Sequence, residues 1–406
     1  MSQGDTAAIS LEQVRRVSER DRELVIHTPV LPSAHLSEQC GGHIVLKAEN
    51  LQRTGAFKIR GVMNKLAVLG DRAQKGVVAG SAGNHAQALA FAARHFGTPC
   101  EIYVPAGASL SKMAACRGYG ATVHEGGESL DTAVANARVR ANETGMVFCH
   151  PYDDPDIVTG QATLGLELIK DIDGLTQVVV PLGGGGLLSG VALAVKQTDP
   201  SIKVIGVQVS SCAPYLHGTA PKGPVATLAD GIAVKAPGKV TAALIDQWVD
   251  EIIEVDEESV ADAMMLLLER AKLFVEGAGA VGVSALISNR ITPAKRGTTC
   301  VVLSGGNADL GPLTGLIRRH ETILGRRLIL FVRISDRPGG LARLLTLFAQ
   351  NGANLVEVEH VREGVDLHVR ETGVHVVLEV RGRDHAEMLI ASAKGEGYEL
   401  SEVTGH

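Results

Sequence analysis

The chain has 406 residues, of which 45% are apolar and 21% charged, so it is long enough for two or three globular domains with buried cores. Its formal net charge of −6 and the lack of a Lys/Arg cluster argue against nucleic-acid binding, because phosphate contacts need clustered basic side chains. Six scattered cysteines show neither CxxC nor zinc-ligand spacing, so we expect free thiols and no metal site.

No signal peptide or membrane span is expected. The first 21 residues are polar and charged and lack an apolar core segment, which favours a cytoplasmic location. Residues 178–195 carry no charge, but Pro181 and four consecutive glycines interrupt them. That pattern predicts a buried strand, a loop and the start of a helix.

From about residue 40 to 325, short apolar runs alternate with segments of helical periodicity. Strands are predicted at residues 44–48, 77–80, 100–104, 121–124, 146–149, 177–180, 203–207 and 299–303, and helices at 85–95, at 130–144 and from the glycine run to Lys196. Alternating strands and helices indicate parallel sheets covered on both faces, which is an α/β fold.

The pattern changes near residue 326. Strands are predicted at residues 328–334, 354–361 and 374–380, with helices at 341–350 and 384–394. The order βαββαβ within about 75 residues is typical of a ferredoxin-like unit. We therefore expect one domain over residues 1–325 and a second over 326–406.

Lys58 is the candidate nucleophile of the first domain. It lies between apolar and glycine neighbours, Gly55-Ala56-Phe57 before it and Ile59 after it, beyond the predicted strand at residues 44–48. Desolvation disfavours an ammonium ion, so the free amine that condenses with a carbonyl becomes accessible at such a position.

Residues 183–187 (Gly-Gly-Gly-Gly-Leu) join a predicted strand to an apolar helix, and their backbone N–H groups suit an anion. No Lys-Ser/Thr pair follows, which excludes a P-loop. A dinucleotide fingerprint is poor, because Gln208-Val209 stands where an acidic ribose ligand is expected. A single phosphate is the better guest, and a tight turn without a ligand is the alternative.

Two further loops follow predicted strands. In residues 81–85 (Ser-Ala-Gly-Asn-His) the amide of Asn84 can donate to a phenolate-like oxygen, or it can simply cap a helix. His85 is a candidate acid or base that is as often structural. Ser304, in Ser-Gly-Gly-Asn, places a hydroxyl at the carboxyl end of a strand, where α/β sheets bind ligands.

An amine, an amide donor, an anion cradle and a hydroxyl complement the groups of pyridoxal phosphate. Across about residues 10–320 the chain resembles fold-type-II pyridoxal-phosphate enzymes of the threonine dehydratase (threonine ammonia-lyase) and serine racemase family, and residues 150–154 (His-Pro-Tyr-Asp-Asp) and 228–232 (Leu-Ala-Asp-Gly-Ile) also conform. The resemblance implies two open parallel-sheet subdomains, with the smaller one, about residues 55–155, inserted in the larger.

The resemblance also implies β-elimination of L-threonine to 2-oxobutanoate and ammonia, with L-serine as a secondary substrate. Lys58 would bond covalently to the cofactor and remove the Cα proton. The implied cofactor contacts are Phe57, Lys58, Asn84, Gly183, Gly184, Gly185, Gly186, Leu187 and Ser304, and the implied substrate contacts are Ser81, Ala82, Gly83, Asn84 and His85.

Several alternatives remain. Racemases of this family have a serine directly before Gly-Asn-His, where this chain has Ala82, and Gln208 and Pro214 stand where a divalent metal would want carboxylates. Racemisation is therefore disfavoured, and no tightly bound divalent metal is expected. Serine dehydratase activity, a β-replacement synthase and a non-catalytic amino-acid-binding regulator are the other interpretations.

The tail from residue 328 resembles an ACT regulatory domain, through Asp-Arg-Pro-Gly-Gly-Leu at residues 336–341. The resemblance implies allosteric control by an amino acid, with isoleucine or valine favoured, a role in isoleucine biosynthesis, and a homo-oligomer, either a dimer or a homotetramer. A domain that only mediates assembly is the alternative. The implied effector residues are Asp336, Pro338, Gly339, Gly340, Leu341 and Asn354.

Overall fold

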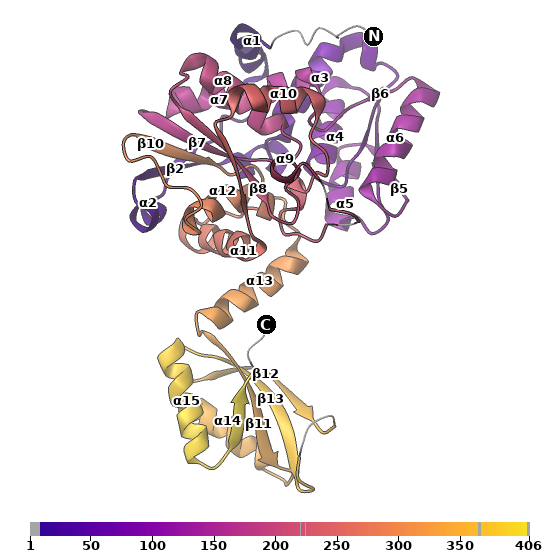
Figure 1. Cartoon of the computed structure of the whole chain (residues 1–406). Coiled ribbons are helices and arrows are strands. Elements are labelled where there is room, and N and C mark those ends of the chain that lie inside the picture. Colours follow the sequence, from indigo (N-terminus) through magenta and orange to yellow (C-terminus); the bar gives the residue numbers. More distant parts are fainter. Residues whose placement is uncertain (1–8, 220, 224, 364–366, 404–406) are drawn as a thin grey trace. The chain divides into compact units, whose positions relative to one another are not determined.

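The structure is a computed structural model that describes residues 9–219, 221–223, 225–363 and 367–403 (Figure 1). The chain divides into two compact units, Met1–Ala308 and Asp309–His406. Helix α13 (Leu310–Ile323) therefore belongs with the second unit, whereas the boundary expected from the sequence follows this helix.

The larger sheet of the first unit has the strand order β1-β2-β10-β7-β8-β9, with β1 antiparallel to β2 and all the other pairs parallel. Its strands are β1 (Val30–Pro32), β2 (His43–Lys47), β7 (Leu175–Pro181), β8 (Lys203–Val209), β9 (Glu251–Val255) and β10 (Thr298–Val302). Strands β7 and β10 are buried along nearly their whole length, as expected for a parallel sheet covered on both faces.

The smaller sheet has the order β5-β4-β3-β6 and is entirely parallel. Its strands are β3 (Val77–Gly80), β4 (Cys100–Val104), β5 (Thr122–Glu125) and β6 (Val147–Phe148). The predicted strands at residues 77–80 and 100–104 match β3 and β4. One mainly parallel and one fully parallel open sheet in the same unit confirm the α/β fold inferred from the sequence.

Helices cover both sheets of the first unit (Figure 1). They are α1 (Leu11–Asp21), α2 (Ala34–Cys40), α3 (Lys58–Leu69), α4 (Asn84–Phe96), α5 (Leu110–Gly118), α6 (Leu130–Thr144), α7 (Pro155–Asp171), α8 (Gly186–Thr198), α9 (Pro214–His217), α10 (Lys239–Trp248), α11 (Glu257–Leu266) and α12 (Gly277–Ile287). Short 3₁₀ turns occur at η1 (Glu49–Leu51), η2 (Arg53–Gly55), η3 (Gly70–Ala73) and η4 (Asp230–Ile232), and a π turn occurs at η5 (Leu267–Ala271). None of the helices in the described residues is long and apolar enough to cross a membrane.

The sheet of the second unit is antiparallel, with the order β12-β13-β11-β14. Its elements, in chain order after α13, are β11 (Arg327–Ser335), α14 (Gly340–Gln350), β12 (Asn354–Val361), β13 (Glu371–Glu379), α15 (Arg383–Gly395) and β14 (Glu399–Glu402). Leu344 and Phe348 of α14 and Leu389 of α15 pack on the sheet and form one apolar core. The predicted βαββαβ order is confirmed.

Candidate functional site

Lys58 begins helix α3, and its amine points at an uncharged partner. The Nζ donates to the carbonyl oxygen of Pro151 at 2.9 Å and lies 5.1 Å from the centroid of the Phe57 ring. Part of the side chain still reaches solvent, but the surrounding protein desolvates the ammonium group and lowers the pKa of Lys58 to about 8, against the attraction of Glu276. A sizeable fraction of this amine is neutral near physiological pH, as a nucleophile requires.

Neighbouring atoms leave no room for side chains on the glycine loop between β7 and α8. A Cβ added to Gly184 would lie 2.3 Å from Cδ1 of Tyr152, and one added to Gly183 would lie 2.8 Å from the Cα of Ile232. Gly185 has φ +93°, a left-handed conformation that favours glycine. These contacts explain why a run of glycines, and not one turn residue, occupies this junction.

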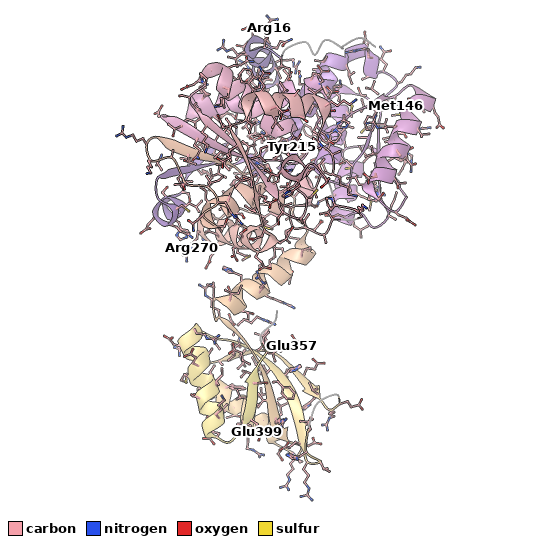
Figure 2. All side chains as sticks on the ribbon, viewed as in Figure 1. Arg16, Met146, Tyr215, Arg270, Glu357 and Glu399 are labelled. Carbon is pink, nitrogen blue, oxygen red and sulfur yellow. The ribbon has the colours of Figure 1, made fainter. Side chains whose placement is uncertain are left out.

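The same loop is anchored through the carbonyl group of Gly184. The carbonyl of Gly184 accepts from the hydroxyl of Thr241 at 2.8 Å and from the hydroxyl of Tyr215, labelled in Figure 2, at 3.3 Å. Helix α8 begins at Gly186, so the N–H groups of its first turn have no partner within the helix. A fixed loop with such N–H groups at a helix N-terminus is suited to an anion such as phosphate.

Asn84 is held by two side chains, one from Asn307, beyond strand β10, and one from Glu276, just before helix α12. Its Oδ1 accepts from Asn307 Nδ2 at 2.8 Å, and its Nδ2 donates to Glu276 Oε1 at 2.7 Å. The residue that caps α4 is Gly83, which makes no side-chain cap. The interpretation of Asn84 as a helix cap is therefore wrong, because its amide is engaged in this tertiary network.

Glu276 is a site residue that the sequence reasoning missed. It is 4% exposed, and burial raises the pKa of its carboxyl to about 7, with a further increase from the nearby Asp230. It stands between apolar and glycine neighbours, in Phe274-Val275-Glu276-Gly277-Ala278. An acidic residue in such a segment is the signal that could have drawn attention to it.

Ser304 lies just beyond β10, against the segment that leads to Lys58. Its backbone carbonyl accepts from the N–H of Phe57 at 3.1 Å, and Ala56 forms an isolated β-bridge with Gly305. A Cβ on Gly305 would lie 2.3 Å from Glu276 Oε1. The structure thus brings Ser304, Lys58, Asn84 and Glu276 into one region.

The residues of the loop at 81–85, all predicted to contact the substrate, differ in their surroundings. The Ser81 hydroxyl accepts from the N–H of Gly83 at 3.3 Å, and His85 is buried with Nε2 3.0 Å from the carbonyl of Cys149. Burial, reinforced by the charge of Lys58, lowers the pKa of His85 to about 3, so its ring is neutral. The ring therefore packs in the core, and any ligand contact here comes from the backbone of this loop and from Asn84.

A buried ion network supports the first turns of α3. Arg60 donates to Glu49 through Nε at 2.7 Å and Nη2 at 2.8 Å, and to Glu167 through Nη1 at 2.7 Å. Both the Arg60 and Glu49 side chains are essentially inaccessible. Burial by itself would lower the pKa of Arg60, but the carboxylates of Glu49 and Glu167 outweigh this effect and raise the pKa above its ordinary value. Because Arg60 follows Lys58 by two residues, this network fixes the helix that presents the amine.

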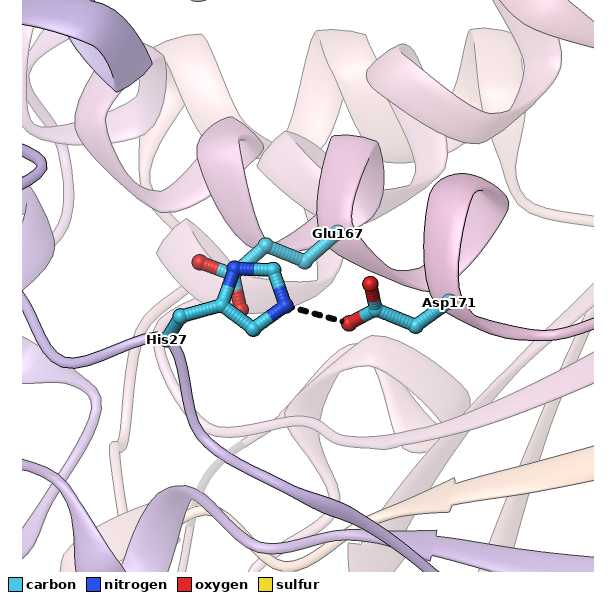
Figure 3. A group of neighbouring side chains, drawn as sticks. All are labelled: His27, Glu167 and Asp171. Atoms are coloured by element: carbon cyan, nitrogen blue, oxygen red, sulfur yellow. Dashed lines mark hydrogen bonds and ion pairs between the residues drawn. The ribbon is translucent and has the colours of Figure 1, made fainter.

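Glu167 also belongs to a group of possible metal ligands with His27 and Asp171, drawn in Figure 3. His27 Nε2 lies 2.6 Å from Asp171 Oδ2. The buried ammonium of Lys47 already lies 2.7 Å from Glu167 Oε2 and 3.4 Å from Asp171 Oδ2. This cluster is therefore an ion-pair network whose carboxylates have a cationic partner within the chain.

Two ion pairs connect the parts of the first unit that carry the two sheets. Lys112 of α5 lies 3.6 Å from Asp230 of η4, and Lys235 lies 3.6 Å from Asp131 of α6. Asp230 raises and Lys112 lowers the pKa of Glu276. The charges of the first pair therefore reach the region around Lys58.

In the second unit, the predicted effector residues fall into two places. Asp336 pairs with Arg362 at 2.9 Å, and Gly339 and Gly340 form the N-terminal end of α14. Asn354 donates to Glu379 of β13. Glu379 lies opposite Arg327 in the β-ladder, and Arg327 is at the other end of β11 from Ser335. That length of strand separates the two places by roughly 27 Å, so within one copy they do not form a single site.

Comparisons with known proteins agree with this architecture. A sequence model of the pyridoxal-phosphate dependent enzyme family matches residues 22–305, and one of the ACT domain matches residues 328–393. L-threonine ammonia-lyase of Geobacter sulfurreducens is 42% identical over 95% of this chain and 97% of its own length. L-threonine ammonia-lyase of Thermotoga maritima is 42% identical over 97% of this chain and 100% of its own.

Solved structures are also similar to this chain. The processed form of threonine deaminase isoform 2 from Solanum lycopersicum superimposes with a TM-score of 0.70 at 30% identity, covering 75% of this chain and 92% of its own. Maize serine racemase gives a TM-score of 0.71 at 33% identity, covering 78% of this chain and 99% of its own.

The residues fit pyridoxal phosphate, the cofactor of this family. The glycine loop leaves room only for backbone and would hold the phosphate, Lys58 offers an amine of lowered pKa, and Asn84 has a second amide N–H beyond the one given to Glu276. The chain belongs to the fold-type-II pyridoxal-phosphate-dependent enzymes, as a member of the threonine ammonia-lyase group that carries a C-terminal ACT domain.

Proposed function

We propose that this chain catalyses the β-elimination of L-threonine to 2-oxobutanoate and ammonia, with L-serine as a secondary substrate. The observation that carries the proposal is the amine of Lys58, with its lowered pKa, in the same unit as a glycine cradle suited to phosphate. The naming of the two relatives above as L-threonine ammonia-lyases supports threonine as the substrate.

Pyridoxal phosphate, when bound, supplies an electron sink that eases loss of the substrate α-proton and β-hydroxyl. Lys58 would hold the cofactor and, once the substrate amine has displaced it, would serve as the base at Cα, since a free amine with a pKa of about 8 can both accept and return a proton near neutral pH. The loop from Gly183 to Leu187 would bind the phosphate through backbone N–H groups. Phe57 would pack against the ring, and Asn84 would donate to its phenolic oxygen.

Ser304 offers a neutral hydroxyl to the ring nitrogen. A hydroxyl would not enforce a positive charge there as a carboxylate does, so negative charge at Cα would be less stabilised and elimination would be favoured over transamination. The backbone at the start of α4 receives the substrate carboxylate. Ala82 provides no hydroxyl on which a racemase-type proton transfer could depend, and Ser81 already accepts from Gly83.

Substitution of Lys58 tests this function. Lys58→Ala should lose the visible absorbance of the covalently bound cofactor and lower turnover of L-threonine by several orders of magnitude, because nucleophile and base are lost together. Exposed Lys170, replaced in the same way, is the matched control. Borohydride reduction and peptide mapping should place the pyridoxyl label at Lys58; a label at another lysine, or 2-oxobutanoate formed by Lys58→Ala at the rate of the parent enzyme, would refute the assignment.

We propose further that the second unit binds an amino-acid effector, isoleucine or valine, in a homo-oligomeric, cytoplasmic enzyme of isoleucine biosynthesis. A cavity of about 500 Å³ beside the loop at residues 336–341 is lined by Arg337, Arg343 and Arg370, whose guanidinium groups suit a carboxylate. Asn354 lies at the other end of the sheet, so a site that uses both regions requires two copies.

Steady-state formation of 2-oxobutanoate, measured with L-isoleucine or L-valine added in turn, tests this regulatory role. We expect one of them to change the rate at sub-millimolar to millimolar concentration, with the D-isomers as controls. Indifference to both, together with no change in sedimentation, would leave the second unit as an assembly module.

A further inference from the structure

Glu276 is a buried carboxyl group that receives its hydrogen bonds from uncharged donors. Asn84 Nδ2 donates to its Oε1 at 2.7 Å, and the backbone N–H of Asn307 also donates to it. Its own N–H donates to the carbonyl of Gly305 at 3.0 Å. A buried carboxyl without a contacting cation is costly to retain, and this one precedes α12 without capping that helix through its side chain.

The hydrogen bonds around Glu276 leave one orientation for the amide of Asn84. The backbone carbonyl of Thr54 can only accept, so the group of Asn307 that contacts it at 2.7 Å must be the Nδ2. That same Nδ2 contacts Asn84 at 2.8 Å, which makes the Asn84 atom the oxygen. The NH₂ group of Asn84 therefore faces Glu276, and it keeps one N–H that Glu276 does not use.

Charges from two other elements act on Glu276, and Glu276 acts on a third element. Asp230 of η4 raises its pKa, Lys112 of α5 lowers it, and Lys58 of α3 is in turn stabilised as a cation by the carboxylate. With burial as the largest cause, the pKa of Glu276 is about 7. Its charge therefore changes in the range in which the Lys58 amine also begins to lose its proton.

We propose that Glu276 is a positioning residue of the cofactor site, which orients the amide of Asn84 and places a carboxylate charge in the region of the Lys58 amine. The inference rests on the proposed role of Lys58. It assigns to Glu276 a function toward pyridoxal phosphate that acts through two neighbours, Asn84 and Lys58, without a contact of its own.

The cofactor-loaded enzyme tests the electrostatic part. Its absorbance spectrum changes with pH as the nitrogen that bonds to the cofactor gains or loses a proton. Glu276→Gln keeps an oxygen that accepts from Asn84 but removes the charge, so the midpoint should fall by about 1 pH unit or more. Glu276→Asp restores a carboxyl group, and its midpoint should return toward that of the parent enzyme.

The positioning part is tested by cofactor affinity. Fluorescence titration of the cofactor-free protein with pyridoxal phosphate should show about the parent dissociation constant for Glu276→Gln. Glu276→Ala, which removes the acceptor, should bind about tenfold more weakly, the order expected for one lost hydrogen bond to a buried group. Glu128→Gln, at an exposed position, is the control that removes a carboxylate elsewhere.

A midpoint for Glu276→Gln that coincides with the parent value would overturn the inference, even if borohydride still labels Lys58. The parent enzyme gives a second readout should the variants fail to fold. Infrared difference spectra between about pH 6 and pH 8 should show a buried carboxyl group losing its proton. The absence of that signal equally overturns the inference, whereas a label at another lysine would instead overturn the proposed function.

Discussion

Gly184→Ala should weaken cofactor binding through one overlapping methyl group. The added Cβ would lie 2.3, 2.4 and 2.5 Å from Cδ1, Cγ and Cε1 of Tyr152. Ordinary carbon contacts are about 3.5–4.0 Å, so the ring must move by roughly 1 Å or more. The ring cannot simply rotate away, because its hydroxyl donates to the carbonyl of Ala236 at 3.1 Å.

Movement of the Tyr152 ring would also disturb Lys58. Tyr152 directly follows Pro151, whose carbonyl accepts from Lys58 Nζ. Overpacking of this kind costs about 1–3 kcal/mol, and the cofactor-free protein can relieve it by moving the loop at residues 150–154. Bound cofactor needs the loop and the glycine cradle in place together, so the cost falls on binding. We expect the dissociation constant for pyridoxal phosphate to rise by about 10- to 100-fold.

The assay is titration of the cofactor-free protein with pyridoxal phosphate, followed by the absorbance of the bound form. Gly118→Ala is a matched control, because no atom of the described residues lies within 4 Å of its added Cβ and its backbone does not require glycine. Circular dichroism checks that both variants fold. A Gly184→Ala protein with the affinity of Gly118→Ala would refute the view that steric closure makes this loop glycine-rich.

Three further changes probe other parts of the site. Arg60→Met leaves Glu49 buried without its cation and should lower the free energy of unfolding by about 3–5 kcal/mol in urea denaturation, whereas an equal loss from exposed Arg117→Met would contradict this. The pKa of Glu276 is raised from an ordinary value of 4.5 to about 7, so the folded state bears the cost of its ionised form above pH 7 and none below 4.5. Glu276→Gln should therefore stabilise the cofactor-free protein by roughly 3 kcal/mol at pH 8 and by nothing at pH 4, and equal thermal shifts at both values would contradict the burial argument. Ala82→Ser adds a hydroxyl where racemases have one, and chiral chromatography of L-serine incubations should detect D-serine; its absence would show that more than this hydroxyl is missing.

The sheets were predictable because parallel strands that are buried on both faces consist of continuous apolar runs in the sequence. Residues 77–80 and 100–104 match β3 and β4 without a shift. Domain boundaries that depend on tertiary packing were harder to predict from the sequence. Helix α13 follows the last strand of the first unit without a composition change, so the sequence alone suggests a boundary after it, near Gly325.

The site divides in a similar way. Lys58 and the glycine loop are recognisable because amines and glycine runs are unusual in apolar surroundings. Glu276 is not recognisable from the sequence, since its carboxyl joins the site only when folding brings it to Asn84, 192 residues away in the chain. The local preference of Asn84 for a helix cap was overridden by that same tertiary contact.

The strength of the ion pairs Lys112–Asp230 and Lys235–Asp131 should depend on ionic strength. The side chains of Asp230 and Asp131 are 62% and 79% exposed, so mobile counterions can approach both. The screening length shrinks from about 30 Å at 0.01 M salt to about 8 Å at 0.15 M, and exposed pairs weaken accordingly. Dilute buffers would hold the two sheet-bearing parts together more firmly than the salt concentration of a cell does, and rates of ligand entry measured in the two media would differ for that reason.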